Sequence, residues 1–148
     1  MIGVGPNPVT SFNSERVEPQ IDDTEVGEFV RIIGNVSIGS GSEVGERAAI
    51  RADEGSPVII GSGAKIEERV TFHALKGTRV DVGDNLTVGD DSVVFRVRVG
   101  NNVAVGDDVV IQGSANEDGE LELEIPDGAT IPDGSVVTSQ EELDDIVG

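Results

Sequence analysis

Residues 60–73 read IGSGAKIEERVTFH, and an apolar residue stands at every sixth position of this stretch, at Ile60, Ile66 and Phe72. The same spacing returns in further sets of three, which are Ile38, Val44 and Ile50; Val82, Val88 and Val94; Val99, Val105 and Ile111; and Ile125, Ile131 and Val137. Short irregular segments separate the sets. The chain is therefore built from an internal repeat.

A period of six does not suit an α-helix, whose apolar residues recur every 3.6 positions. It suits short strands joined by tight corners, where Gly, Asn and Asp supply the positive φ angles that such corners need. Hexapeptide repeats are a known signature of β-helices. Three strands per coil predict a triangular prism with coils about 4.8 Å apart, in which the Val and Ile residues form the core.

The two ends depart from the repeat. Residues 1–20 contain three prolines and predict an irregular arm, residues 21–138 the β-helix domain, and residues 139–148 a short helix or tail. Ser139 followed by Glu142 fits a capping box. A helix this short is stable only when it docks on the prism.

The composition excludes several classes of function. The 148 residues include 29 acidic and 10 basic side chains, giving a net charge of −19, with no cysteine and one histidine, His73. Such a surface repels phosphate backbones and anionic lipid, so we expect neither nucleic acid nor membrane as a partner. Disulfides and thiolate sites are excluded. No transmembrane span or signal peptide is recognisable, and we expect a cytoplasmic protein.

The acidity has two interpretations. One is an ordinary acidic protein, and the other is adaptation to molar salt, where the Debye length falls to about 3 Å and charges no longer repel one another strongly. With only two lysines against eight arginines, we favour a protein from a high-salt organism. It should then lose structure in low salt.

Three segments carry a family resemblance. They are residues 50–55, IRADEG; residues 70–75, VTFHAL; and the tail at residues 125–140, IPDGATIPDGSVVTSQ. Together they resemble the gamma-class carbonic anhydrases and the related carboxysomal scaffold domain. The resemblance implies a left-handed parallel β-helix that forms a homotrimer. It also implies zinc, iron or cobalt held between subunits by three histidines, with metal-bound hydroxide converting CO₂ to bicarbonate.

His73 matches the first of these ligands, and no other histidine exists to supply the remaining two. After Leu75 the sequence runs directly into what resembles a later coil of the family, so the acidic loop and the ligand-bearing coil are deleted. By the repeat, the second ligand would fall at Phe95, in a column with Arg51 and Gln112. The ligand of the neighbouring subunit would fall at Asp90, whose carboxylate could face a partner's His73.

Other family positions are retained. Arg51 and Asp53 match residues at the subunit interface, where an arginine–carboxylate pair holds a trimer together. Glu54 matches a carboxylate implicated in proton transfer, and Glu67 stands where the family has a glutamine near the site. Both are catalytic candidates by resemblance.

Three functions compete. The first is a homotrimeric, carbonic-anhydrase-like protein with an incomplete metal site and little or no CO₂ hydration, with a structural or binding role. The second is an active carbonic anhydrase with a rebuilt zinc site that uses His73 and a neighbour's Asp90, and takes CO₂ or bicarbonate as substrate. The third is a hexapeptide acyltransferase with His73 as general base. The cofactor is accordingly none or zinc.

Overall fold

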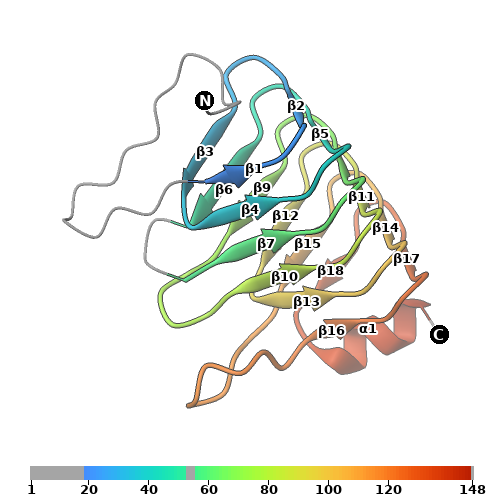
Figure 1. The fold of residues 1–148 in the computed structure, drawn as a ribbon. Coiled ribbons are helices and arrows are strands. Elements are labelled where there is room, and N and C mark those ends of the chain that lie inside the picture. Colours follow the sequence, from blue (N-terminus) through green and yellow to red (C-terminus); the bar gives the residue numbers. More distant parts are fainter. Residues whose placement is uncertain (1–18, 53–55, 148) are drawn as a thin grey trace.

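The computed structural model describes residues 19–52 and 56–147 and consists of three parallel sheets around one core (Figure 1). Sheet A contains β1 (Gln20–Ile21), β4 (Val36–Ile38), β7 (Val58–Ile60), β10 (Val80–Val82), β13 (Val97–Val99) and β16 (Glu124–Ile125). Sheet B contains β2 (Glu25–Val26), β5 (Glu43–Val44), β8 (Lys65–Ile66), β11 (Thr87–Val88), β14 (Ala104–Val105) and β17 (Thr130–Ile131). Sheet C contains β3 (Arg31–Gly34), β6 (Ala49–Ala52), β9 (Thr71–His73), β12 (Val93–Phe95), β15 (Val110–Gln112) and β18 (Val136–Val137).

The chain passes through sheets A, B and C in turn, so each coil adds one strand to every sheet. The predicted fold class, a left-handed parallel β-helix with a short C-terminal helix, is confirmed. All of the apolar residues of the repeat point inward, and none is more than 6% exposed. The structure adds a first coil at β1–β3, whose inward residues Ile21, Val26 and Ile32 the repeat had not included.

The corners between sheets A and B and between sheets B and C turn through left-handed residues. We name them the A/B corner and the B/C corner. The A/B corner uses Asp23, Gly41, Gly63, Asn85, Asn102 and Gly128, and the B/C corner uses Phe29, Arg47, Arg69, Asp91, Asp108 and Gly134. Gly, Asn and Asp are the residue types expected at positive φ. Phe29, Arg47 and Arg69 are not, and their φ values are 61°, 60° and 58°.

The remaining corner, the C/A corner, contains the large variations in coil length. It consists of a single residue at Asn35 and at Arg96. Elsewhere it is a longer connection, at residues 53–57, 74–79 and 113–123. Equivalent residues of neighbouring coils are 17, 18, 22 or 26 positions apart, and the spacing of 18 arises because the A/B corner of the first coil is one residue shorter than that of the second. The long insertions between the described strands therefore emerge along one edge.

Helix α1 (Gln140–Val147) closes the C-terminal end. The Glu142 N–H donates to Ser139 Oγ at 3.2 Å, as the predicted capping box requires. The return contact differs by one residue, because the Glu142 carboxylate accepts from the Thr138 N–H at 2.8 Å and from its hydroxyl. Leu143 is fully buried against the last coil.

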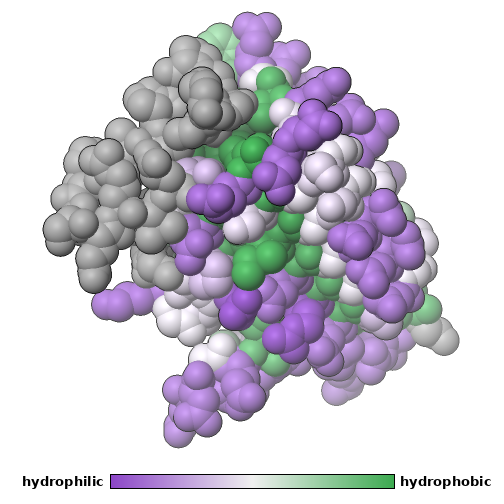
Figure 2. All heavy atoms as spheres, in the orientation of Figure 1, coloured by the Kyte–Doolittle hydropathy of each residue, from purple (hydrophilic) through white to green (hydrophobic). Residues whose placement is uncertain are grey.

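Hydrophilic residues cover most of the described surface that Figure 2 shows, with hydrophobic residues visible between them. Within residues 19–52 and 56–147 there is no helix long and apolar enough to cross a membrane. The expected arm at residues 1–20 lies almost wholly outside the described residues, and its last residue, Gln20, begins β1.

Candidate functional site

Two of the site candidates from the sequence, Arg51 and His73, lie together on the outer surface of sheet C. Parallel pairing aligns Ile33 with Arg51, Arg51 with His73, His73 with Phe95, and Phe95 with Gln112. This is the column that the repeat predicted. Because successive strand residues alternate between the two faces, these side chains point outward while Ile50, Phe72 and Val94 fill the core.

His73 is half-buried and lies beside Phe95 of the next coil. The two ring centroids are 5.8 Å apart, and the rings meet edge to face at 75°. This arrangement is favourable for aromatic pairs. It also places a carbon ring, which has no lone pair for a metal, on the strand that the resemblance assigns to the second histidine.

The donor set around His73 does not fit a zinc ion within one chain. Zinc sites use three or four nitrogen, sulfur or oxygen ligands from the protein. Arg51 on one side of His73 is a cation and Phe95 on the other side is a hydrocarbon. Within the described residues, no group of three or more His, Cys, Asp or Glu side chains is placed to hold a metal ion.

Glu67 and Asp90 lie at the B/C corner, whereas His73 lies at the C/A end of sheet C. Glu67 pairs with Lys65, at 3.8 Å between Oε2 and Nζ. Neither carboxylate belongs to the His73 column, so a site that combined them with His73 would need a second copy of the chain. Asp53 and Glu54 lie outside the described residues, and Arg51 is exposed on sheet C.

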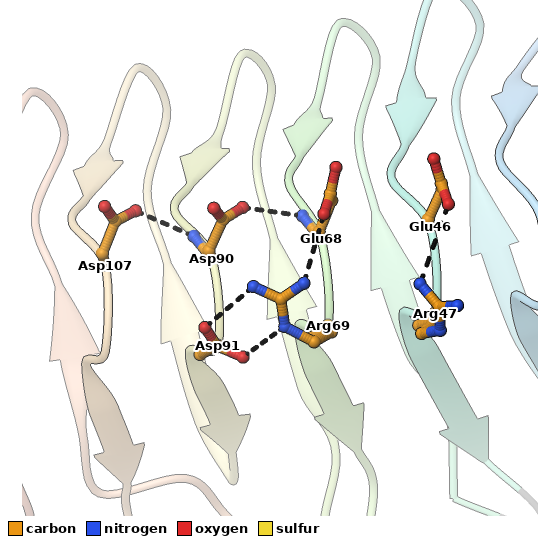
Figure 3. Close-up of polar contacts among 7 residues, drawn as sticks. All are labelled: Glu46, Arg47, Glu68, Arg69, Asp90, Asp91 and Asp107. Carbon is orange, nitrogen blue, oxygen red and sulfur yellow. Dashed lines mark hydrogen bonds and ion pairs between the residues drawn. The ribbon is translucent and has the colours of Figure 1, made fainter.

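Asp90 belongs to a ladder of carboxylates along the B/C corner (Figure 3). Its Oδ1 accepts the Glu68 N–H at 2.9 Å, and the Asp90 N–H in turn donates to Asp107 Oδ1 at 2.8 Å. Asp107 repeats the pattern with Asp133 at 2.7 Å. These carboxylates satisfy corner N–H groups that no strand reaches. Asp90 therefore stabilises the corner, independently of any role as a metal ligand.

Sequence reasoning did not predict one bidentate ion pair at this corner. Arg69 Nε and Nη2 donate to the two carboxylate oxygens of Asp91 at 2.7 and 3.1 Å, and Arg69 Nη1 also contacts Glu68 at 3.2 Å (Figure 3). The Arg69 guanidinium, chiefly through its hydrogen bonds, lowers the pKa of Asp91 below its usual range. The 22-residue spacing between Arg69 and Asp91 could have predicted this pair, once both residues are assigned to the B/C corner of neighbouring coils.

The outer surface of sheet C carries no acidic residue in its described strands, although the chain has 29 of them. Its outward residues are Arg31, Ile33, Ala49, Arg51, Thr71, His73, Val93, Phe95, Val110, Gln112 and Val136. Val136 is 55% exposed. The apolar and small residues run as a stripe along the prism, unlike the outer surface of sheet B, which begins with Glu25 and Glu43.

Comparison with known proteins supports the fold. No family model matches the sequence. A Bacillus cereus protein provisionally named as an acetyltransferase is similar with a TM-score of 0.53 and 22% identity, over 86% of this chain and 72% of that one. A histidine-to-alanine mutant of GDP-perosamine N-acetyltransferase from Caulobacter crescentus, solved with CoA and GDP-perosamine, gives a TM-score of 0.50 and 17% identity, over 77% and 50% of the two chains. The chain is a hexapeptide-repeat β-helix.

At these identities the two structures show the fold of the β-helix and nothing of its chemistry. A sequence match points in another direction. A carbonic anhydrase from Methanosarcina thermophila is 43% identical over 53 residues, which are 35% of the β-helix chain and 22% of that enzyme. The matched segment is thus a minor part of the enzyme's length.

Proposed function

We propose that the chain is a homotrimeric relative of the gamma-class carbonic anhydrases whose metal site is incomplete, with little or no CO₂ hydration and a structural or binding role. The observation that carries this proposal is Phe95, which stacks edge-on against His73 where a second imidazole would stand. The sequence match to a carbonic anhydrase and the retained RADEG segment at residues 51–55 support the relationship.

The chemistry follows from the donor count. Zinc makes a hydroxide available near neutral pH when the protein supplies three ligands and leaves one position to water. Each copy here supplies one imidazole, and the position that the resemblance assigns to the ligand of a neighbour is occupied by Asp90, a carboxylate. Two ligands hold zinc weakly, so a stable water-activating centre is not expected.

The homotrimer is supported by the acid-free surface of sheet C. Self-association of a chain with net charge −19 is favoured where carboxylates are absent or are paired with basic groups. Sheet C offers such a surface over its whole length, with apolar residues such as Val93, Val110 and Val136 in its centre. Burying this stripe against a second copy removes apolar area from water without bringing acidic groups together.

The metal proposal can be tested by returning the missing imidazole. In Phe95→His, two histidines would stand on adjacent strands about 4.8 Å apart in one column. We expect zinc to remain on this variant after dialysis and to be lost from the unaltered protein, as measured by elemental analysis. Phe95→Leu is the matched control, because it removes the ring without adding a donor.

CO₂ hydration, followed by stopped flow in molar salt, completes the test. The unaltered chain should stay near the uncatalysed rate. One zinc per chain together with hydration lost in both His73→Ala and Asp90→Asn would instead establish the rebuilt site. Asp90→Asn is suitable because an amide oxygen still accepts the Glu68 N–H.

The acyltransferase alternative predicts something different. If His73 acts as general base toward an acceptor, acetyl-CoA should bind the unaltered chain in a calorimetric titration, and acetyl transfer to amines should be lost in His73→Ala. Acetyl-CoA binding with transfer would replace the proposed function. We expect neither.

A further inference from the structure

Arg96 forms the one-residue C/A corner between β12 and β13, with a φ of 48°. Its Nε is buried and has no hydrogen-bond partner among the described atoms. A buried donor that makes no hydrogen bond costs about 1–3 kcal/mol, and more when it is charged. Such a group is rare in folded proteins and calls for an explanation. Because Nε is covered by atoms of its own chain, an acceptor on a second copy would have to bind the terminal Nη groups of this partly exposed side chain, for which the structure gives no hydrogen bond or ion pair within the described residues.

The two borders of sheet C differ in charge at the level of the third and fourth coils. On the C/A side the described connecting segments carry Lys76, Arg79 and Arg96, all basic, and Arg79 is paired with Asp81 of β10 at 2.8 Å. On the B/C side they are Glu67, Glu68, Arg69, Asp90 and Asp91, of which only one is basic. Sheet C itself lies between them without an acidic side chain.

A ring of identical prisms joins these unlike borders. When copies are related by rotation about an axis parallel to the prism, the B/C corner of one copy meets the C/A corner of the next at the same level. Arg96 and Asp90 both belong to the fourth coil. An antiparallel pair related by a two-fold axis along the strand direction, perpendicular to the prism axis, would bring the acidic corners together, which is unfavourable.

We propose that Arg96 of one copy binds the carboxylate of Asp90 in the next copy and so fixes the parallel, ring-forming orientation. This inference rests on the proposed homotrimer. Asp90 is better placed than Asp91, because Arg69 already engages both oxygens of Asp91, whereas the intrachain contact of Asp90 is made through Oδ1.

The test is a charge exchange read by sedimentation equilibrium in about 0.15 M salt, near the physiological ionic strength at which charges are still felt across about 8 Å. Arg96→Glu should raise the dissociation constant of the trimer at least about tenfold, since close interfacial charge pairs couple by more than 1.4 kcal/mol. Adding Asp90→Lys in the same chain should restore much of the association. Asp90→Lys alone should weaken it.

Arg98→Glu is the matched control, because Arg98 lies two residues further on and points from sheet A toward Asp81 and Glu124. It should leave the trimer unchanged. Circular dichroism checks folding, and Arg96→Gln replaces the reversal if that variant unfolds. A trimer indifferent to both Arg96 variants overturns the inference and leaves the assembly standing. An unaltered chain that is monomeric at all concentrations overturns the assembly itself.

Discussion

At the scale of the residue, several corner carboxylates accept backbone hydrogen bonds in addition to carrying surface charge. Asp107 shows this well, because its Oδ1 accepts the Asp90 N–H at 2.8 Å. In the parallel ladder at the A/B corner, Asn101 Oδ1 accepts the Asp84 N–H at the same distance, so an amide serves equally. The negative charge is therefore not required for the bond.

Two variants of Asp107 separate the bond from the charge. Asp107→Ala should lose about 1 kcal/mol, because it leaves a corner N–H without its acceptor. Asp107→Asn keeps the acceptor and removes one charge, so its stability should equal or exceed that of the unaltered chain, most clearly in low salt. Urea unfolding at two salt concentrations measures both. Equal losses in the two variants would contradict the prediction.

The Arg69–Asp91 pair makes a prediction about pH. The pKa of Asp91 is held below its usual range by the Arg69 hydrogen bonds, so the folded state favours the ionised carboxylate. The stabilisation is present above the ordinary aspartate pKa of about 3.9 and is lost as pH falls through the lower, folded-state pKa. Carboxyl-carbon NMR titration should show the low midpoint for Asp91. Arg69→Gln should return it to the ordinary range.

At the scale of the element, α1 protects an open sheet edge. The Gln140 side chain pairs with β16 as a further strand would: its Oε1 accepts the Glu124 N–H at 2.9 Å and its Nε2 donates to the Glu124 carbonyl at 3.0 Å. An unpaired edge is prone to pairing with other chains. The side-chain amide of Gln140 thus caps the edge of sheet A at its last strand, β16.

Gln140→Ala should therefore speed hydrogen exchange at the Glu124 amide, while Glu141→Ala on the exposed side of α1 should not. Exchange mass spectrometry provides the measurement. Unchanged exchange at Glu124 in Gln140→Ala would refute the edge-pairing role.

Leu143→Ala should lower the free energy of unfolding by about 2–5 kcal/mol, since Leu143 is fully buried and anchors a helix too short to persist alone. Thermal unfolding provides the measurement.

The sequence predicted the fold and the His73 column because both depend on a period of six, which is a local property. It could not predict that Arg47 and Arg69 adopt positive φ, because arginine is normally found at negative φ. The cost of the unusual conformation is offset only by contacts that form when neighbouring coils stack. The sequence also could not show that the Asp90 carboxylate accepts a hydrogen bond, because this contact too depends on the stacking of coils. Its partner, the Glu68 N–H, lies 22 residues away and comes within reach only when the coils stack.

At the scale of the whole molecule, charge is unevenly distributed along the prism. The first 79 residues carry twelve acidic and eight basic side chains, and the remainder carry seventeen acidic and only two basic ones, Arg96 and Arg98. The repulsion is thus concentrated in the last three coils and α1. In a solenoid each coil contacts only its neighbours, so one end can open while the other stays folded.

Lowering the salt should therefore unfold the C-terminal coils first. The Debye length grows from about 3 Å at 1 M salt to about 30 Å at 0.01 M, which lets all carboxylates of that half repel one another. Hydrogen exchange at 0.01 M should show lost protection in β13–β18 with protection kept in β4–β9. Simultaneous loss along the whole prism would contradict this prediction, and unchanged exchange would also remove the high-salt interpretation.

The C/A corner has a consequence for how such a chain can change length. The coil from Arg79 to Phe95 takes 17 residues and returns the backbone to the starting edge one level higher. A block of this size can therefore be excised or duplicated as a cassette. Its cut ends meet at the same edge, and the flanking coils stack on each other with their inward residues still in register.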